Sequence, residues 1–157
     1  MADVNIGLDG NSRKAVAEAL NGVLADTYIL YMKTHSYHWN VTGPQFHTLH
    51  VMFEEQYREM WAALDVIAER VRALGEFAPT SGADFANRSG LESADTEPPK
   101  ATDMIKNLLA DHESLVRRAR EALETASQAD DAATDDLITQ RIQTHEKTAW
   151  MLRAMIS

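Results

Sequence analysis

Two pairs of side chains in one stretch of the sequence combine imidazole and carboxylate groups at helical spacing. His50 and Glu54 are four residues apart, and so are Asp65 and Glu69. Residues four apart in an α-helix project from the same face. Imidazole with carboxylate is a ligand mixture that suits Fe(II), Mn(II) or Zn(II). The pattern therefore indicates a metal site, to which His38 can contribute from the end of the preceding helix.

The two pairs are too far apart to share a metal within one chain. The fifteen residues from His50 to Asp65 span about 22 Å of straight helix, whereas a metal–ligand bond is only about 2 Å long. The pairs nevertheless face similar directions. Two copies of the helix crossing antiparallel about a two-fold axis would bring the first pair of each copy to the second pair of the other. This predicts a homodimer with two equivalent sites, and an axis near Glu59 and Met60.

Two other interpretations compete with this site. Ordinary surface pairs at i,i+4 spacing, together with a core histidine, would give the same residues. A di-iron site inside one bundle would need Glu-x-x-His motifs. The residues three before each histidine include no glutamate, which disfavours that site; they are Met32, His35, Pro44, His47, Leu109 and Ile142.

Long helices are expected to position these residues. Asn11 or Ser12 can cap a first helix that carries His38 near its end. A second helix is expected from about Pro44, at its first position, to Leu74, with Gly75 at its stop. The first helix has apolar and threonine residues at helical spacing, namely Val16, Leu20, Val23, Thr27, Leu30 and Thr34.

The second half of the sequence predicts another helical hairpin. Residues 76–101 form a crossover with a short helix near Asp84 to Asn87, and Thr102 can cap a third helix that ends at about Ala126. The acidic stretch QADDAATDDL connects it to a fourth helix. The core residues expected in these two helices are Ile105, Leu108, Leu109, Leu115, Leu123, Ile138, Ile142, His145, Ala149, Leu152 and Ile156. Two hairpins joined by a long crossover predict an all-α, ferritin-like four-helix bundle.

Composition limits the class of protein. With 157 residues, 45% hydrophobic and 25% charged, the chain fits one globular domain at 11–157 after a mobile tail at 1–10. The absence of cysteine excludes disulfides and thiolate metal sites. No apolar run is long enough to cross a membrane, and a cytoplasmic protein is expected. The net charge of −9 repels nucleic acid and attracts cations.

The sequence also resembles the Dps family of mini-ferritins. The resemblance rests on KTHSYHWNVTGPQFHTLHVMFEEQY from Lys33, on D-x-x-A-E-R at 65–70, and on THEKTAWMLRAM near the end. It implies a ferroxidase whose ligands are His38, His50, Glu54, Asp65 and Glu69. Many members have aspartate at the position of Glu54, and glutamate can still coordinate.

The resemblance further implies a hollow homododecamer. Such a shell oxidises Fe(II), with hydrogen peroxide preferred to oxygen, stores the ferric mineral inside and protects against oxidative stress. The alternatives are a DNA-compacting protein, which would be associated with the nucleoid, and a shell that sequesters zinc or manganese without turnover. Since the tail lacks a lysine cluster, strong DNA binding is not expected.

Several other residues have a possible role at the site. His35 and His47 lie one turn before His38 and His50 and could add ligands that favour zinc, a competitor of Fe(II), although such histidines more often hydrogen-bond to neighbouring groups. Trp39 could quench radicals beside the site, and simple packing explains it at least as well. Trp61 could anchor the dimer interface. His145 is expected to be a satisfied core histidine.

Acidic residues suggest a route for iron. Asp130, Asp131, Asp135 and Asp136 precede the fourth helix, where carboxylates stabilise a helix N-terminus. In the resembling family, comparable residues line a three-fold pore that admits Fe(II), and they are pore candidates here. Glu55 could face the cavity and help to seed mineral, although a solvated glutamate explains it equally well.

Overall fold

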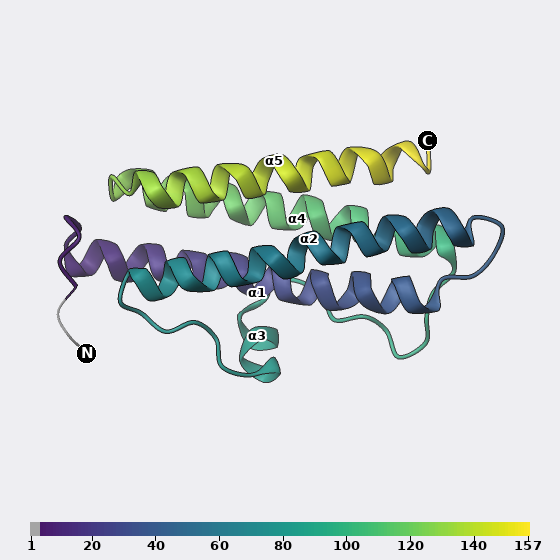
Figure 1. Cartoon of the computed structure of the whole chain (residues 1–157), viewed down its shortest axis with the longest axis horizontal. Helices are drawn as coiled ribbons and strands as arrows, with labels where there is room; N and C mark the ends of the chain where they lie inside the picture. Colours follow the sequence, from purple (N-terminus) through teal and green to yellow (C-terminus); the bar gives the residue numbers. More distant parts are fainter. Residues whose placement is uncertain (1–3) are drawn as a thin grey trace.

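The computed structural model describes residues 4–157 and consists of helices and connecting segments, with no strand among those residues. The helices are α1 (Gly10–Asn40), α2 (Phe46–Ala73), α3 (Gly82–Arg88), α4 (Ala101–Gln128) and α5 (Ala132–Ala154). The α1–α2 hairpin lies along the α4–α5 hairpin, and the short α3 lies outside against α1 (Figure 1). The predicted ferritin-like four-helix bundle and the extra crossover helix are confirmed.

The start of α1 differs from the prediction. Asp9 is the N-cap, and its carboxylate accepts hydrogen bonds from the backbone N–H groups of Asn11 and Ser12. The prediction that Asn11 or Ser12 caps the helix was wrong, because an N-cap carboxylate reaches the N–H groups two and three residues ahead. Of the expected tail, residues 1–3 lie outside the described residues. Leu8 packs against the core, so the end of this segment is attached to the bundle.

The other helix ends are close to their predicted places, with three corrections. Pro44 lies in the turn before α2 rather than at its first position. The N-cap of α4 is Lys100, without a side-chain hydrogen bond, so Thr102 lies inside the helix. The acidic stretch is mostly helical, because Asp131 caps α5 and its carboxylate accepts from the backbone N–H of Thr134. Gly75 has φ +94°, a conformation that suits glycine at a helix stop.

The core is formed where the predicted faces of the four long helices meet. All six residues of the predicted α1 stripe are buried. Thr27 and Thr34 are tolerated there because their hydroxyls donate to the backbone carbonyls of Val23 and Leu30. On α5, His145 is fully buried, as expected for a core histidine.

The crossover is held against α1 by a buried carboxylate. Asp26 is 1% exposed and accepts hydrogen bonds from Arg118, Ser89 and the backbone N–H of Gly90. Removing a partner from a buried ion pair commonly costs about 3–5 kcal/mol. This contact therefore fixes the segment that carries α3.

Two polar contacts attach α2 to α5. Arg70 donates to Asp131 and Thr134 near one end. Near the middle, Arg141 makes a bidentate ion pair with Glu59. These contacts fix the orientation of α2 about its own axis and so determine which of its side chains face away from α5.

Candidate metal centre

His38 and His50 form the core of the candidate site where α1 ends and α2 begins. Their rings stack with centroids 3.8 Å apart and planes 18° apart. The Nδ1 of His38 donates to the backbone carbonyl of His50 at 2.8 Å, and the Nδ1 of His50 donates to the carbonyl of His38 at 2.8 Å. The two hydrogen bonds are reciprocal and fix both rings.

This arrangement determines the tautomer of both histidines. A carbonyl oxygen only accepts hydrogen bonds, so each Nδ1 must carry the hydrogen. In the neutral imidazole, Nε2 then has the lone pair, which is the form that binds a metal. Backbone carbonyls bonded to the other ring nitrogen are common partners of metal-binding histidines. The Nε2 atoms of His38 and His50 are therefore available as metal ligands.

Aromatic side chains surround the pair. Phe46, one turn before His50, stacks on its ring with centroids 5.1 Å apart. Tyr57 meets His38 edge to face at 5.2 Å. His38 is only 8% exposed. These rings limit the rotation of the imidazoles and exclude water from one side of the site.

Glu54 lies one turn after His50, as the spacing predicts, but it has a partner within the subunit. Its carboxylate accepts from the Nε of Arg58 at 2.8 Å and from Nη2 at 2.7 Å. The Arg58 side chain is 68% exposed and that of Glu54 is 36% exposed. An exposed pair of this kind contributes little to stability, so a cation can displace the guanidinium from the carboxylate.

Asp65 and Glu69 are both exposed and lie farther along α2. The straight helix separates them from the histidines by about 22 Å. Among residues 4–157, no group of three or more His, Cys, Asp or Glu side chains is placed to hold a metal ion. The candidate ligands thus lie in two separate groups within one subunit.

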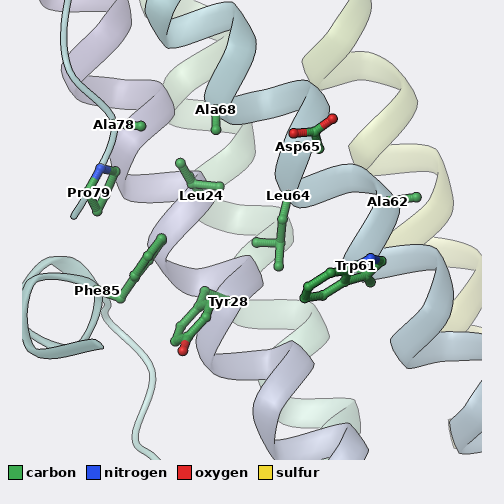
Figure 2. Close-up of a pocket in the computed structure, with 10 residues that line it drawn as sticks. All are labelled: Leu24, Tyr28, Trp61, Ala62, Leu64, Asp65, Ala68, Ala78, Pro79 and Phe85. Atoms are coloured by element: carbon green, nitrogen blue, oxygen red, sulfur yellow. The ribbon is translucent and has the colours of Figure 1, made fainter. Parts of the chain in front are cut away.

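A groove of about 600 Å³ lies beside Trp61 and Asp65 of α2. Figure 2 shows Trp61 and Leu64 of α2 across from Tyr28 of α1, with Phe85 of α3 at one side and Asp65 above. Trp61 is 64% exposed. The lining is mainly apolar and consists of Leu24, Tyr28, Trp61, Ala62, Leu64, Asp65, Ala68, Ala78, Pro79 and Phe85.

Glu59 and Met60, near which the predicted two-fold axis crosses α2, do not themselves lie on the face of the two ligand pairs. Met60 is 1% exposed and packs in the core, and Glu59 is engaged by Arg141 of α5. Both side chains therefore point away from the face that carries the ligands. Arg58 and Trp61, both exposed, lie midway between the two pairs on the stripe that His50 begins.

The other predicted residues separate into two groups. His35 lies beside the site, where its ring stacks between Tyr57 at 3.8 Å and Trp39 at 4.1 Å. Its Nδ1 is hydrogen-bonded to the hydroxyl of Tyr31 at 3.2 Å. Burial, with smaller contributions from His38 and Arg58, lowers the pKa of His35. This residue is thus a neutral packing partner of the site.

His47 and Glu55 lie elsewhere. Both line a groove beside Met151 of α5, on a different face of α2 from His50. Trp39 is 60% exposed and reaches the site only through its stacking on His35.

The acidic residues before α5 also have different environments. Asp131 is 3% exposed and accepts from Arg70 and Thr134. Burial acts to raise the pKa of Asp131, but these hydrogen bonds outweigh it and the pKa is lowered. Asp131 stabilises the helix end, whereas Asp130, Asp135 and Asp136 are the more accessible pore candidates.

Three residues of the site were not identified from the sequence. Phe46 and Arg58 lie four residues before His50 and four after Glu54, a spacing that places them on the ligand face. Tyr57 lies seven residues after His50, again two helical turns along the same face. Helical spacing was therefore sufficient to find them.

Comparisons with known proteins agree with the fold and the motif. The model of the ferritin-like domain family matches residues 17–157. An uncharacterised low temperature-induced protein of Nostoc sp. is 41% identical over 157 residues, which covers 99% of this chain and 88% of that protein. DNA protection during starvation protein 2 of Bacillus anthracis is 37% identical over 144 residues, covering 92% and 98%.

Solved structures give the same result. The crystal structure of a DPS protein from Vibrio cholerae O1 superposes with a TM-score of 0.93 at 31% identity, covering 100% of this chain and 98% of that one. That protein is described as a member of a broad superfamily of ferritin-like diiron-carboxylate proteins. With its four-helix bundle and its motif from Lys33 to Arg70, this chain belongs to the Dps family of ferritin-like proteins.

Proposed function

We propose that the protein is a mini-ferritin that oxidises Fe(II) with hydrogen peroxide or oxygen at di-iron centres between subunits. Each centre takes His38, His50 and Glu54 from one subunit and Asp65 and Glu69 from its two-fold mate. The ferric product is stored inside a hollow homododecamer. Iron is thus the substrate and the cargo of the protein.

The reciprocal hydrogen bonds of His38 and His50 carry this proposal. They fix the tautomer in which both Nε2 atoms keep a lone pair for a metal ion. Imidazole and carboxylate ligands together suit Fe(II). The exposed carboxylates of Asp65 and Glu69 are too far away to complete the set in the same subunit, and antiparallel pairing of α2 would bring them to the histidines.

The apolar groove supports the same dimer. An exposed tryptophan on an apolar surface is typical of an interface anchor. Trp61 lies between the two ligand pairs, so a second subunit docked over this groove would cover Trp61 and bring the pairs together. In a two-fold interface every contact occurs twice, which gives two equivalent centres per dimer.

The residues supply binding and electrostatics, and the iron supplies the electrons. Two Fe(II) ions held side by side can each give one electron to the same peroxide molecule, which reduces it fully without release of a hydroxyl radical. The carboxylates offset the added charge of the ferric product. The histidines hold the ions in place because their rings are fixed by carbonyls and by stacking.

DNA compaction is not part of the proposal. The name of the Bacillus anthracis relative refers to DNA protection, but this chain has a net charge of −9. An acidic assembly repels the phosphate backbone at physiological salt. We therefore expect no gel shift of duplex DNA at neutral pH without divalent metal, and a clear salt-sensitive shift would contradict this expectation.

An anaerobic Fe(II) titration followed by a peroxide pulse tests the proposed function. We expect about two Fe(II) bound per subunit and about one peroxide consumed for every two Fe(II) oxidised, in a particle whose measured mass corresponds to a dodecamer. Metal binding without peroxide consumption would instead identify a shell that only sequesters metal. A monomer that binds and oxidises iron normally would contradict the inter-subunit site.

A further inference from the structure

One positively charged side chain lies among the candidate ligands on α2. Spacings of three and four residues place six side chains along one face of this helix. We call this face the ligand stripe, and it consists of His50, Glu54, Arg58, Trp61, Asp65 and Glu69. Three of the six carry carboxylates, and Arg58 is the only arginine or lysine. Arg58 is thus the one side chain of the stripe that can offset their charge.

Within the subunit, the Arg58 side chain reaches back one turn toward the start of α2. Its Nε lies 2.8 Å and its Nη2 2.7 Å from Oε1 of Glu54. Its guanidinium carbon lies 5.9 Å from the centre of the Tyr57 ring. The side chain is nevertheless largely exposed. The guanidinium therefore has room for a second set of contacts from another subunit.

The antiparallel pairing of α2 in the proposed dimer determines what Arg58 meets. The shared centre brings Glu54 of one subunit to Asp65 of the partner subunit. Arg58 lies four residues after Glu54, and Trp61 lies four residues before Asp65. In antiparallel helices a step forward along one is a step back along the other. Arg58 therefore lies opposite Trp61 of the partner subunit.

Trp61 is suited to receive the guanidinium. Its side chain is mostly exposed, and within the subunit its ring meets Tyr31 at 5.6 Å with the planes tilted by 47°. An arginine over a tryptophan ring gains a cation–π contact, which is stronger when water is excluded. Because Arg58 reaches back toward Glu54, its guanidinium would lie between Trp61 and Asp65 of the partner subunit. One cation would then contact carboxylates of both chains.

Pairing concentrates negative charge at each centre before iron binds. Glu54 of one subunit comes close to Asp65 and Glu69 of the partner subunit, so three carboxylates meet beneath an interface. Like charges repel more strongly there than in water, because the surroundings screen them less. Juxtaposed like charges oppose association. A dimer that forms without iron therefore needs a cation of its own at this place.

We propose that Arg58 is the counter-ion of the shared centre before iron binds and that it stabilises the iron-free dimer. The inference rests on the proposed function, since it uses the shared centre. The guanidinium offsets the charge of Glu54 and of Asp65 of the partner subunit, and it packs on Trp61 of the partner subunit. Iron then displaces it from the carboxylates. The shell can thus assemble without iron and be loaded afterwards.

Dissociation of iron-free particles tests this role. Wild type and Arg58→Gln are treated with a chelator, and mass photometry records the particle mass over a dilution series. Both samples contain the same urea concentration, too low to unfold the subunit and chosen so that wild type dissociates within the series. The midpoint for Arg58→Gln should lie at a concentration at least about tenfold higher. An exposed ion pair is worth only a few-fold, but each two-fold contact contains two such centres.

Zinc provides the metal-bound arm of the same experiment. Zn(II) binds imidazole and carboxylate ligands and has no redox chemistry, so particle mass is the only readout. After the chelator is removed and Zn(II) is added, the metal supplies the missing positive charge. We expect most of the difference between Arg58→Gln and wild type to disappear. A difference that Zn(II) leaves unchanged would overturn the proposal, because Arg58 would then act as an ordinary interface residue.

Arg120→Gln is the matched control for net charge. The Arg120 side chain is 59% exposed, against 68% for Arg58, and it pairs with Glu146 of α5. The control therefore loses the same charge from an exposed ion pair that lies off the ligand stripe. Its iron-free midpoint should equal that of wild type. An equal shift in Arg120→Gln would attribute the effect to net charge and overturn the proposal.

A double variant separates charge from packing. Arg58→Gln with Asp65→Asn removes one carboxylate together with the cation, so iron-free assembly should recover toward wild type. A double variant as unstable as Arg58→Gln alone would overturn the proposal, and so would equal iron-free midpoints of Arg58→Gln and wild type. These results would leave the shared centre intact. A wild type that is monomeric both with and without Zn(II) would instead contradict the proposed function.

Discussion

The two histidine pairs of this protein differ in the groups that accept their ring hydrogens. In the pair at the α1–α2 turn, backbone carbonyls accept from both Nδ1 atoms and leave both Nε2 atoms able to bind metal. In the pair between α4 and α5, the Arg141 guanidinium donates to the Nε2 of His145, whose Nδ1 then donates to the Nδ1 of His112 and leaves the hydrogen of His112 on Nε2. The histidines at the α1–α2 turn thus keep free Nε2 lone pairs that can bind a metal ion. The pair between α4 and α5 has no free lone pair for one.

This difference shows that the hydrogen-bond partner, more than burial, determines whether a histidine can be a ligand. His38 is itself only 8% exposed, yet its Nε2 lone pair is not used by a hydrogen bond that fixes the ring. His112 has a ring of the same kind in the core, but its lone pair is already used by His145. Predictions that change one pair and leave the other intact therefore test the comparison.

The largest effect is expected from His50→Ala. Loss of a metal ligand should slow fast Fe(II) oxidation by more than about 100-fold. Loss of a residue that only hydrogen-bonds to a ligand costs up to about 100-fold, and loss of the ligand itself should cost more. Assembly should be retained, because His50 is not part of the core. His112→Asn is the control and should oxidise iron at the wild-type rate. Stopped-flow absorbance after a peroxide pulse measures both, and equal rates in the two variants would contradict the assignment of roles.

Acidification should act through the buried pair. In the unfolded chain each histidine binds a proton below about pH 6.5, whereas in the folded protein burial lowers the pKa of His112 to about 3 and that of His145 well below its usual value. The unfolded state then binds more protons in this range. Stability should fall as the pH drops from about 6.5 toward 3, by up to about 1.4 kcal/mol per pH unit for each histidine.

Urea unfolding between pH 7 and pH 4 measures this effect. His112→Asn should reduce the slope of stability against pH. The exposed His47 gives the matched control, since His47→Asn should keep the wild-type slope. The same slope in all three proteins would show that the buried pair does not set the acid sensitivity.

Arg141→Leu should disturb the buried pair without affecting the outer one. The change leaves the Nε2 of His145 without a donor and Glu59 without its partner, at an expected cost of about 1–3 kcal/mol. The urea midpoint should fall. The initial rate of Fe(II) oxidation should stay within about twofold of the wild-type rate, because about twofold corresponds to the smallest free-energy change that is significant. A large loss of oxidation in a folded Arg141→Leu shell would mean that the two pairs are coupled.

The smallest effect concerns Arg58. Within the subunit its guanidinium competes with a cation for the carboxylate of Glu54. Arg58→Gln should therefore tighten Fe(II) or Zn(II) binding by a few-fold, roughly the energy of an exposed ion pair. Anaerobic calorimetry measures the affinity, and weaker binding in the variant would indicate that Arg58 assists the site instead.

The sequence was sufficient for the helices and the ligand spacing because both depend on local periodicity. It placed His50, Glu54, Asp65 and Glu69 on one face of α2, and this face is the one that the bundle leaves open. It also gave the predicted two-fold axis a position along α2, near Glu59 and Met60. A count of about 100° per residue adds that Arg58 and Trp61, rather than these two residues, lie on the face of the ligand pairs.

The buried chain of Arg141, His145 and His112 could not be predicted in the same way. It depends on the register between α4 and α5, which no local spacing determines. The capping of α1 by Asp9 instead of Asn11 or Ser12 was open to prediction, but three neighbouring residues could fill that role. The reciprocal hydrogen bonds of His38 and His50 required the three-dimensional turn that brings the two rings together.

Complementation in mixed assemblies tests the shared site most directly. His50→Ala and Asp65→Ala subunits, each inactive alone, are co-expressed with different affinity tags, and mixed particles are purified through both tags. A hetero-pair then has one centre with both defects and one intact centre, so random pairing should restore about a quarter of the wild-type centres. Recovery of Fe(II) oxidation near that fraction is the expected result. If the mixed particles are as inactive as either parent, the ligands do not come from two subunits and the account is contradicted.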